Sequence, residues 1–273
     1  MAMTINTNLM AINAQRNLSL TSANLSTSMS RLSSGMRITA AKDDAAGLAI
    51  SEKMKAEIRG LAQAQRNAND GISLVQTAEG AMDEVSGMLI RMRELAVQAA
   101  NGTTDNTQKG FLDTEYQALA DEIGRIADTT TFNGTHLLNS ASSITLQVGI
   151  GATSDSQVTI AFQDINTMMA AVTGGNIGTA TTALAAITNL DSAINNLSGQ
   201  RGVFGASQNR LESTVRNLAT VQENLSASNS RIRDVDVADE SVAMTRSQIL
   251  MQAGTAVLAQ ANQIPSMALS LLK

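Results

Sequence analysis

The sequence contains no cysteine and a single proline, Pro265, among its 273 residues. The absence of cysteine excludes disulfide bonds, thiolate metal sites and cysteine nucleophiles. With one proline, slow prolyl isomerisation can hardly delay folding. A protein that has to unfold and refold during transport would benefit from both features.

Aromatic residues are also scarce, at 2% of the chain, with no tryptophan and one tyrosine. A core therefore has to be built from Leu, Ile, Val, Met and Ala, which favours closely packed helices. Hydrophobic residues at 43% and charged residues at 16% are typical of a folded chain rather than a disordered one. A net charge of −5 without a visible basic cluster disfavours nucleic-acid binding.

Residue sets that could support catalysis or metal binding are missing from the sequence. His136 is the only histidine, which excludes a histidine-rich metal site. The acidic stretch DVDVADE begins at Asp234 but fails the EF-hand spacing, because Thr245 stands where that loop needs a bidentate Glu. We find no set of nucleophile, base and orienting group, and no phosphate-binding glycine loop. We therefore expect neither an enzyme nor a bound cofactor or metal.

Apolar positions recur with helical spacing along much of the chain. From Ile50 to about Ala100 they step by threes and fours, which predicts one long helix. A shorter helix fits Phe111 to Ile126, and we expect the segment TTTFNGTH that follows it to be a loop. A further row at intervals of seven predicts a helix that packs in a coiled coil, and it consists of Leu190, Leu197, Phe204, Leu211, Leu218, Leu225 and Ile232.

Between these helices, apolar residues alternate with small or polar ones, which predicts a β-hairpin at about residues 143–163. Its strands would contain Ile144 to Ile150 and Val158 to Phe162, with a rather long loop between them. The fold class that we expect is mainly α. It combines long antiparallel coiled-coil helices, paired N- and C-terminal helices and a small β-hairpin.

Both ends of the chain combine helical periodicity with a lack of charge, since residues 1–15 and 247–272 contain no charged side chain. The apolar rows that we expect to mediate contacts of the terminal helices are Leu18, Leu25 and Leu32, and then Ile249, Val257, Ile264 and Leu271. Other apolar residues surround the C-terminal row. A helix there has to be covered on most sides, which pairing within one molecule would not achieve.

Three interpretations of the ends follow, namely a helix pair beside a globular core, membrane insertion and self-association. Membrane insertion is disfavoured because Gln and Asn residues interrupt the C-terminal apolar run and no Lys or Arg cluster flanks it before Lys273. The N-terminal residues do not resemble a secretory signal peptide. We favour self-association, in which the ends order when copies pack together. On periodicity alone, the alternative is a soluble coiled-coil signalling or adaptor protein.

The segment RLSSGMRITAAKDDAAGLAI, at residues 31–50, could be a phosphate-binding loop, a metal site or a joint between helices. Its glycines lack the spacing of a phosphate-binding loop, and two adjacent Asp residues alone make a poor metal site. Gly35 could end the first helix in the left-handed conformation, and Asp43 or Asp44 could accept amide hydrogens at the start of the next helix. We therefore expect a joint.

Long motifs in the chain resemble those of bacterial flagellins. They are NLSLTSANLSTSMSRLSSGMRITAAKDDAAGLAIS from Asn17, QRNANDGISLVQTAEGAMDEV from Gln65, MRELAVQAANGT, TFNGTHLL, and SRIRDVDVADESVAMTRSQILMQAGTAVLAQANQIPSMALSLLK from Ser230. The resemblance covers roughly residues 1–140 and 185–273. It implies a filament in which residues 1–44 and 234–273 form the inner tube and residues 45–233 form the surrounding layer. The short middle resembles a minimal flagellin without large outer domains.

The resemblance also implies a homopolymer that serves motility as part of the extracellular bacterial flagellum. The implied partners are the type III export apparatus, a chaperone at the C-terminal segment, and the filament cap and hook–filament junction proteins. The joint would then connect tube and layer. Its charged residues become candidates for ion pairs with neighbouring subunits, and these are Arg31, Arg37, Lys42, Asp43 and Asp44.

A further implication of the resemblance is recognition by Toll-like receptor 5, the innate-immune receptor for flagellin. The family's contact surface includes an Arg and a Leu within an R-x-R-E-L-A-V stretch and a Glu on the following helix. Arg91, Leu95 and Glu115 match these positions. Ile90 and Met92 replace the more usual Gln and Val beside Arg91.

Overall fold

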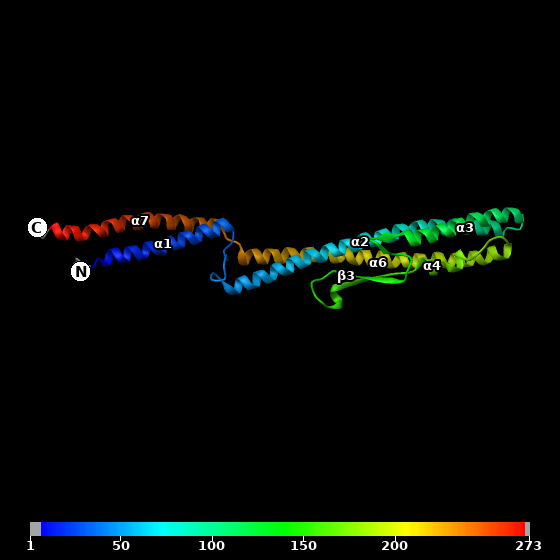
Figure 1. The fold of residues 1–273 in the computed structure, drawn as a ribbon, viewed down its shortest axis with the longest axis horizontal. Coiled ribbons are helices and arrows are strands. Elements are labelled where there is room, and N and C mark those ends of the chain that lie inside the picture. Colours follow the sequence, from blue (N-terminus) through cyan, green and yellow to red (C-terminus); the bar gives the residue numbers. More distant parts are fainter. Residues whose placement is uncertain (1–6, 271–273) are drawn as a thin grey trace. The chain divides into compact units, whose positions relative to one another are not determined.

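The computed structural model describes residues 7–270 and gives their side chains as far as residue 263. The fold is mainly α, as predicted (Figure 1). The long helices are α1 (Leu9–Ser34), α2 (Ala45–Ala100), α3 (Asn106–Thr129), α6 (Ala180–Arg233) and α7 (Val237–Ser270). The short elements are β1 (Thr131–Phe132), β2 (Thr135–His136), β3 (Ser142–Gln147), η1 (Ser154–Ser156), β4 (Gln157–Phe162), α4 (Ile165–Met168) and α5 (Ala170–Thr173).

The chain forms two compact units. Unit 1 contains Met1–Ala56 and Asn224–Lys273, and unit 2 contains Glu57–Glu223. The boundaries expected after residues 44 and 233 coincide with the start of α2 and the end of α6, whereas the compact units divide within these two helices. The assignment of inner tube and surrounding layer to these segments stays a prediction.

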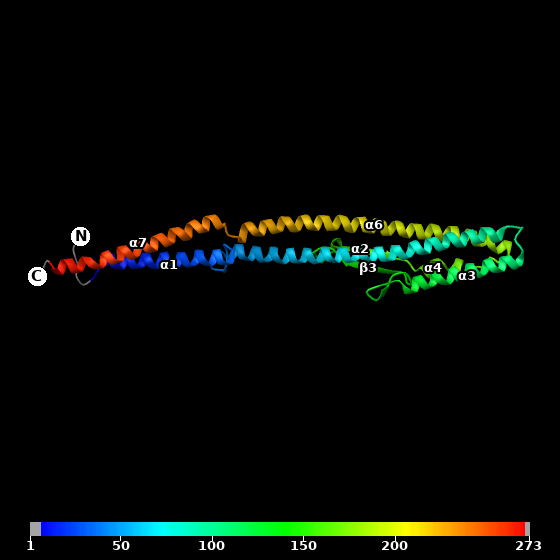
Figure 2. The same ribbon diagram turned by 90° about the horizontal axis from the view of Figure 1, so that it is seen from above.

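In unit 2, α2 and α6 run antiparallel, and α3 follows α2 (Figures 1 and 2). The ion pairs that join α2 to α6 include these two: Arg93 Nε lies 2.6 Å from Asp191 Oδ1, and Arg201 Nη2 lies 3.0 Å from Asp83 Oδ1. Residue numbers fall along α2 as they rise along α6 between these pairs. The expected antiparallel packing of long helices is confirmed.

The core of unit 2 is built on the apolar row of α6. Leu190, Leu197, Phe204 and Leu211 are at most 1% exposed, and Leu218 is 7% exposed. Leu225 and Ile232, farther along the same row, are half-buried. Full burial of each such side chain stabilises the fold by roughly 1.5–3 kcal/mol, so this row is a main source of stability.

The predicted β-hairpin is present, with β3 antiparallel to β4. The first strand ends earlier than expected, because the chain leaves the ladder after Gln147, whereas β4 begins one residue before the expected Val158. The side-chain amide of Gln147 then donates to the carbonyls of Gly149 and Gly151 and organises the loop. A two-stranded hairpin is marginal on its own, so its stability depends on packing against the helices.

Two helix amides and one glycine hold the hairpin against α2 and α6. Asn67 on α2 donates to the Gln147 carbonyl at 2.9 Å, and Gln200 on α6 donates to the Ala161 carbonyl at 2.8 Å. At Gly71 of α2, an added Cβ would lie 2.2 Å from Leu146 Cδ1. Glycine therefore opens the space on α2 that Leu146 fills.

Two other local expectations differ from the structure. The short helix predicted over residues 111–126 is longer, because Asp105 and Gln108 form a capping box that starts α3 at Asn106. The segment TTTFNGTH was expected to be a loop but contains the small β1–β2 hairpin. Asn133 and Gly134 both adopt positive φ, at 48° and 79°, as a tight two-residue hairpin turn requires.

We predict that Gly71→Ala destabilises the protein by about 1–3 kcal/mol, because the new methyl group overpacks against Leu146. Gly80→Ala in the same helix meets nothing within 4 Å and should instead stabilise it by about 0.5–1 kcal/mol. Denaturant unfolding of the full chain measures both changes. In a Leu146→Ala background, Gly71→Ala should cost much less, and an equal cost there would contradict the packing explanation.

Candidate assembly surface and joint

In unit 1, α1 and α7 lie side by side and antiparallel (Figures 1 and 2). Residues spaced alternately by three and four form the contact between them, which we call the seam. The seam residues of α1 are Ala11, Ala14, Leu18, Thr21, Leu25, Ser28 and Leu32, and those of α7 are Met244, Ser247, Met251, Gly254, Leu258 and Ala261. Among them only Ser28 and Ala261 are buried, and the others are half-buried.

The residues expected at the terminal-helix contacts fall into two groups. Leu18, Leu25 and Leu32 lie in the seam. Ile249 and Val257 point away from it and are 59% and 58% exposed. The backbone of Ile264 lies in α7 without a described side chain, and Leu271 lies outside the described residues.

Outside the seam, α1 and α7 carry many exposed large apolar side chains, and we call these surfaces the outer faces. On α1 these side chains are Leu9, Met10, Ile12, Leu20 and Met29, and on α7 they are Val237, Val242, Ile249, Leu250 and Val257. They make up ten of the eighteen exposed large hydrophobic residues whose side chains are described. Such a concentration on one helix pair marks an interaction surface.

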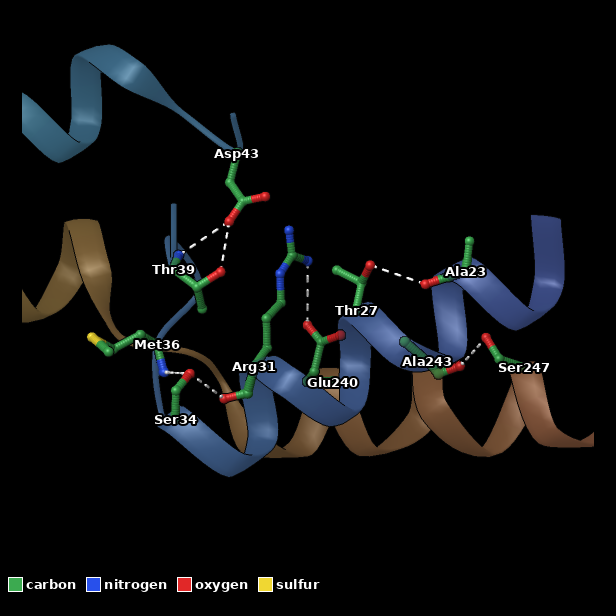
Figure 3. Close-up of polar contacts among 10 residues, drawn as sticks. All are labelled: Ala23, Thr27, Arg31, Ser34, Met36, Thr39, Asp43, Glu240, Ala243 and Ser247. Atoms are coloured by element: carbon green, nitrogen blue, oxygen red, sulfur yellow. Dashed lines mark hydrogen bonds and ion pairs between the residues drawn. The ribbon is translucent and has the colours of Figure 1, made fainter. Parts of the chain in front are cut away.

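The joint between α1 and α2 begins at Gly35, which ends α1 with φ 70° and ψ 9°. A residue with a Cβ adopts this left-handed conformation only with strain. Asp43 then organises the turn, because its Oδ2 accepts hydrogen bonds from the amides of Thr39 and Ala40 and from the Thr39 hydroxyl (Figure 3). These bonds, with that of the Thr39 hydroxyl largest, lower the pKa of the Asp43 carboxyl.

The next residue of the joint, Asp44, starts α2. Its Oδ1 accepts the amide hydrogen of Gly47 at 2.9 Å, which satisfies a free donor of the first turn. An added Cβ at Gly47 would lie 2.4 Å from Asp44 Oδ2 and 2.8 Å from Ile38 Cδ1. The start of α2 is therefore packed against the joint rather than loosely attached to it.

The joint is also bound to the short connection between α6 and α7. Met36 and Asp234 form an antiparallel β-bridge, in which the Arg37 amide donates to the Arg233 carbonyl at 2.7 Å and the Val235 amide donates to the Gly35 carbonyl at 3.1 Å. These backbone bonds hold the two helix-to-helix connections together within unit 1.

Two arginines reinforce this bridge from opposite sides. The Arg37 guanidinium donates to the Ile232 carbonyl at 2.8 Å, near the end of α6. The Arg233 guanidinium reaches α2, where Nη1 lies 2.5 Å from Glu52 Oε1 and 3.4 Å from the Ser51 hydroxyl oxygen. Arg37, between α1 and α2, thus contacts the end of α6, and Arg233, at the end of α6, contacts the first turns of α2.

Within the described residues, Arg31, Arg37, Asp43 and Asp44 of the joint have partners inside the chain. Ion pairs of the joint with neighbouring subunits, Lys42 included, stay a prediction. Arg31 on α1 contacts Glu240 on α7 with Nη1 and Oε2 3.6 Å apart (Figure 3). Asp43 and Asp44 accept backbone amide hydrogens, and Arg37 donates to a helix-end carbonyl. The cause is local, because a break between two helices leaves backbone groups unpaired that nearby side chains satisfy.

The residues expected to contact the immune receptor lie in unit 2. Arg91 on α2 and Glu115 on α3 form an ion pair, with Nη2 and Oε1 2.8 Å apart, and their side chains are 50% and 47% exposed. Glu115 and Glu94 raise the pKa of Arg91 through their hydrogen bonds to its guanidinium. Leu95 is only 1% exposed, so our expectation of a direct contact through Leu95 is not supported. It packs in the core of unit 2 instead.

The described part of the chain contains neither a metal-binding cluster nor a membrane-spanning helix. No group of three or more His, Cys, Asp or Glu side chains there could hold a metal ion. No helix there has an apolar stretch long enough to cross a bilayer.

The geometry of both units agrees with comparisons to known proteins. Residues 5–143 match the family model of the bacterial flagellin N-terminal helical region, and residues 187–272 match that of the bacterial flagellin C-terminal helical region. A flagellin of Halalkalibacterium halodurans is 49% identical over 272 residues, which covers 99% of this chain and 100% of that protein. The flagellar filament 33 kDa core protein of Treponema phagedenis is 44% identical over 289 residues, with 99% and 100% coverage.

A solved structure supports the same relationship. The crystal structure of Bacillus cereus flagellin matches with a TM-score of 0.51 and 38% sequence identity, over 56% of this chain and 88% of that one. The class is thus that of helical structural proteins of the bacterial flagellar filament. Within it, the chain belongs to the bacterial flagellin family, as a short form without a large outer domain.

Sequence reasoning missed the α7 side of the seam and Arg233, and it named Arg37 only as a candidate for an ion pair with a neighbouring subunit. Met244, Met251 and Leu258 also recur at intervals of seven, so the pattern was available. It could not be distinguished from the row through Val257, because α7 is apolar on several sides. The contacts that Arg37 and Arg233 make were not indicated by the sequence, because their partners lie far away along the chain.

We predict that Arg233→Gln loosens the joint, because Arg233 alone joins the end of α6 to Ser51 and Glu52 among the described contacts. Amide hydrogen exchange of residues 35–44 should accelerate, with a loss of about 1 kcal/mol in local stability. Arg231→Gln is the matched control, since Arg231 contacts only Ser228 of its own helix. Equal exchange in the two variants would argue against the clamp.

Proposed function

We propose that the chain polymerises into the flagellar filament through the outer faces of α1 and α7. The proposal rests on one observation above others, namely that these two helices contribute ten of the eighteen exposed large apolar side chains that are described. Each such side chain gains roughly 1.5–3 kcal/mol when fully buried, so several together can offset the entropy lost on association. The partner that supplies matching apolar faces is another copy of this chain.

In this proposal α1 and α7 form the inner tube, and the remaining helices with the β3–β4 hairpin form the surrounding layer. The half-burial of Leu18, Leu25 and Leu32 supports this arrangement, because a two-helix pair leaves them partly accessible until neighbouring copies cover them. The filament is extracellular and serves motility.

Delivery to the growing filament follows from the same proposal. The subunit passes unfolded through the type III export apparatus, with a chaperone on the C-terminal segment, and assembles between hook–filament junction and cap proteins. The absence of cysteine and the single proline support this route, because neither disulfide reshuffling nor several slow prolyl bonds would delay refolding outside the cell.

The assembly surface can be tested by placing a charge on the α7 outer face. We expect Ile249→Glu and Val257→Glu to abolish growth on filament seeds, because each would bury an unpaired carboxylate between subunits. Asn217→Glu, on an exposed polar position of α6 outside the two terminal helices, is the control for added charge and should polymerise. Sedimentation of seeded reactions measures the polymer.

Two results would contradict the surface proposal. Normal sedimentation of both outer-face variants would show that the outer face is not buried in the filament. A wild-type chain that remains a small oligomer in the presence of seeds would favour the soluble coiled-coil signalling or adaptor protein.

We also propose that Toll-like receptor 5 binds the exposed Arg91–Glu115 pair on α2 and α3. The support is that Glu115 and Glu94 already hold the guanidinium in place at 2.8 Å and 3.0 Å, so little side-chain entropy is lost on binding. In this version Leu95 acts indirectly, by packing the helix that carries Arg91.

Arg91→Ala should weaken binding to a soluble receptor ectodomain by about tenfold or more, as is usual for a buried interface arginine. Arg125→Ala, which removes an exposed arginine of α3 paired only with Glu122, should leave binding unchanged. Surface plasmon resonance on monomeric protein measures the affinity. Unchanged affinity of Arg91→Ala would refute the site.

A further inference from the structure

Between Ala14 and Ser28 of α1, each layer of the seam with α7 pairs a large side chain with a small one. Leu18 faces Gly254, where an added Cβ would lie only 3.1 Å from Leu18 Cδ1. One heptad farther along each helix, in opposite directions, Leu25 faces Ser247. The intervening positions reverse the order, because Thr21 faces Met251.

This alternation excludes small shifts of one helix along the other. A shift by three or four residues would place Leu18 against Met251 or Leu258, and it would place small side chains against each other in the next layer. Overpacked layers would then alternate with voids, and each defect costs on the order of 1–3 kcal/mol.

A shift by a full heptad preserves the alternation and has to be excluded by other contacts. At one end of the seam, the Asn8 side-chain amide donates to the Ala261 carbonyl at 2.8 Å. At the other end, Arg31 lies 3.6 Å from Glu240, whose side chain is only 13% exposed (Figure 3). Two helical turns of displacement, about 10 Å, would break both contacts.

The Arg31–Glu240 pair is the stronger of these two constraints. The Nε atom of Arg31 is buried and has no hydrogen-bond partner among the described groups, so Glu240 is the carboxylate that compensates this guanidinium. A shifted helix would leave the Glu240 carboxylate, which is 13% exposed, and the partly buried Arg31 guanidinium without compensation, which is more costly than losing a fully exposed pair. Gly254 also opposes a shift by one heptad. Such a shift would place Ser247 or Ala261 opposite Leu18, and both carry a Cβ that glycine lacks.

We propose that Gly254 and the Arg31–Glu240 pair specify a single antiparallel register of α1 and α7, and that this register decides whether the outer faces can polymerise. The second part rests on the proposed filament function. The outer face of each helix is continuous with the seam, so a slide of α7 would move Ile249 and Val257 relative to Leu20 and Met29. A neighbouring copy would then meet a different composite surface.

The lack of cysteine allows the register to be measured directly, because introduced thiols are the only ones present. The full-length variant Thr21→Cys/Met251→Cys places two thiols face to face in the proposed register. Thr21→Cys/Met244→Cys and Thr21→Cys/Leu258→Cys place them one heptad apart in either direction. Treatment with a short thiol-reactive cross-linker, before and after growth on seeds, is followed by denaturing electrophoresis.

We expect Thr21→Cys/Met251→Cys to form an intramolecular link at least fivefold faster than either of the two displaced double variants. Gly254→Val in this background should slow the link and reduce sedimented polymer, whereas Ala253→Val, on an exposed position of α7 outside the seam, should leave the linking rate unchanged. Arg31→Glu should also reduce both, and the exchange Arg31→Glu/Glu240→Arg should restore them.

The possible failures are distinguishable. Equal linking in all three double variants, or links between chains at positions 21 and 251, would overturn the specified register even if filaments form. Normal linking and normal polymer in Gly254→Val would overturn the role of Gly254. Correct linking in a chain that is otherwise wild-type but does not polymerise on seeds would support the register, overturn its coupling to assembly and contradict the proposed filament function.

Discussion

A helix that is apolar around most of its circumference has to be covered on most sides, and this constraint governs the protein. Unit 2 meets it internally, because α2, α3, α6 and the β3–β4 hairpin surround a common core in which Leu211 is fully buried. In unit 1 the terminal helices α1 and α7 pack only against each other along the seam. Ile249, in the apolar row expected for the C-terminal helix, therefore remains 59% exposed. Similar sequence patterns thus lead to a completed core in one unit and an uncovered surface in the other.

The parts of the fold that depend on local periodicity could be predicted from the sequence. The seven-residue row from Leu190 to Leu218 is buried, and the alternating residues around Ile144 and Ile160 form a hairpin. The loop expected over TTTFNGTH was wrong, because the dipeptide Asn133–Gly134 is itself a signal for a two-residue hairpin turn. The α7 seam was ambiguous for a physical reason, since several rows on an apolar helix have the same spacing and only the position of α1 selects one of them.

Contacts between distant segments were beyond sequence reasoning. Arg233 and Glu52 meet because two helix breaks lie next to each other, and no spacing within either segment indicates this. The receptor motif shows a related limit. Matching residues to the family motif indicated Arg91 and Leu95, which both lie on α2, but the burial of Leu95 depends on which neighbours pack over that turn of the helix.

The β-bridge between Met36 and Asp234 has a mechanical consequence. If the α1–α2 and α6–α7 connections were independent, tension on α1 or α7 would be carried by one connection alone. Here the two connections are joined by hydrogen bonds between Arg37 and Arg233 and between Val235 and Gly35. Tension applied to α1 or α7 is therefore shared between the two connections. The hydrogen-bonded pair of connections also resists rotation about either one.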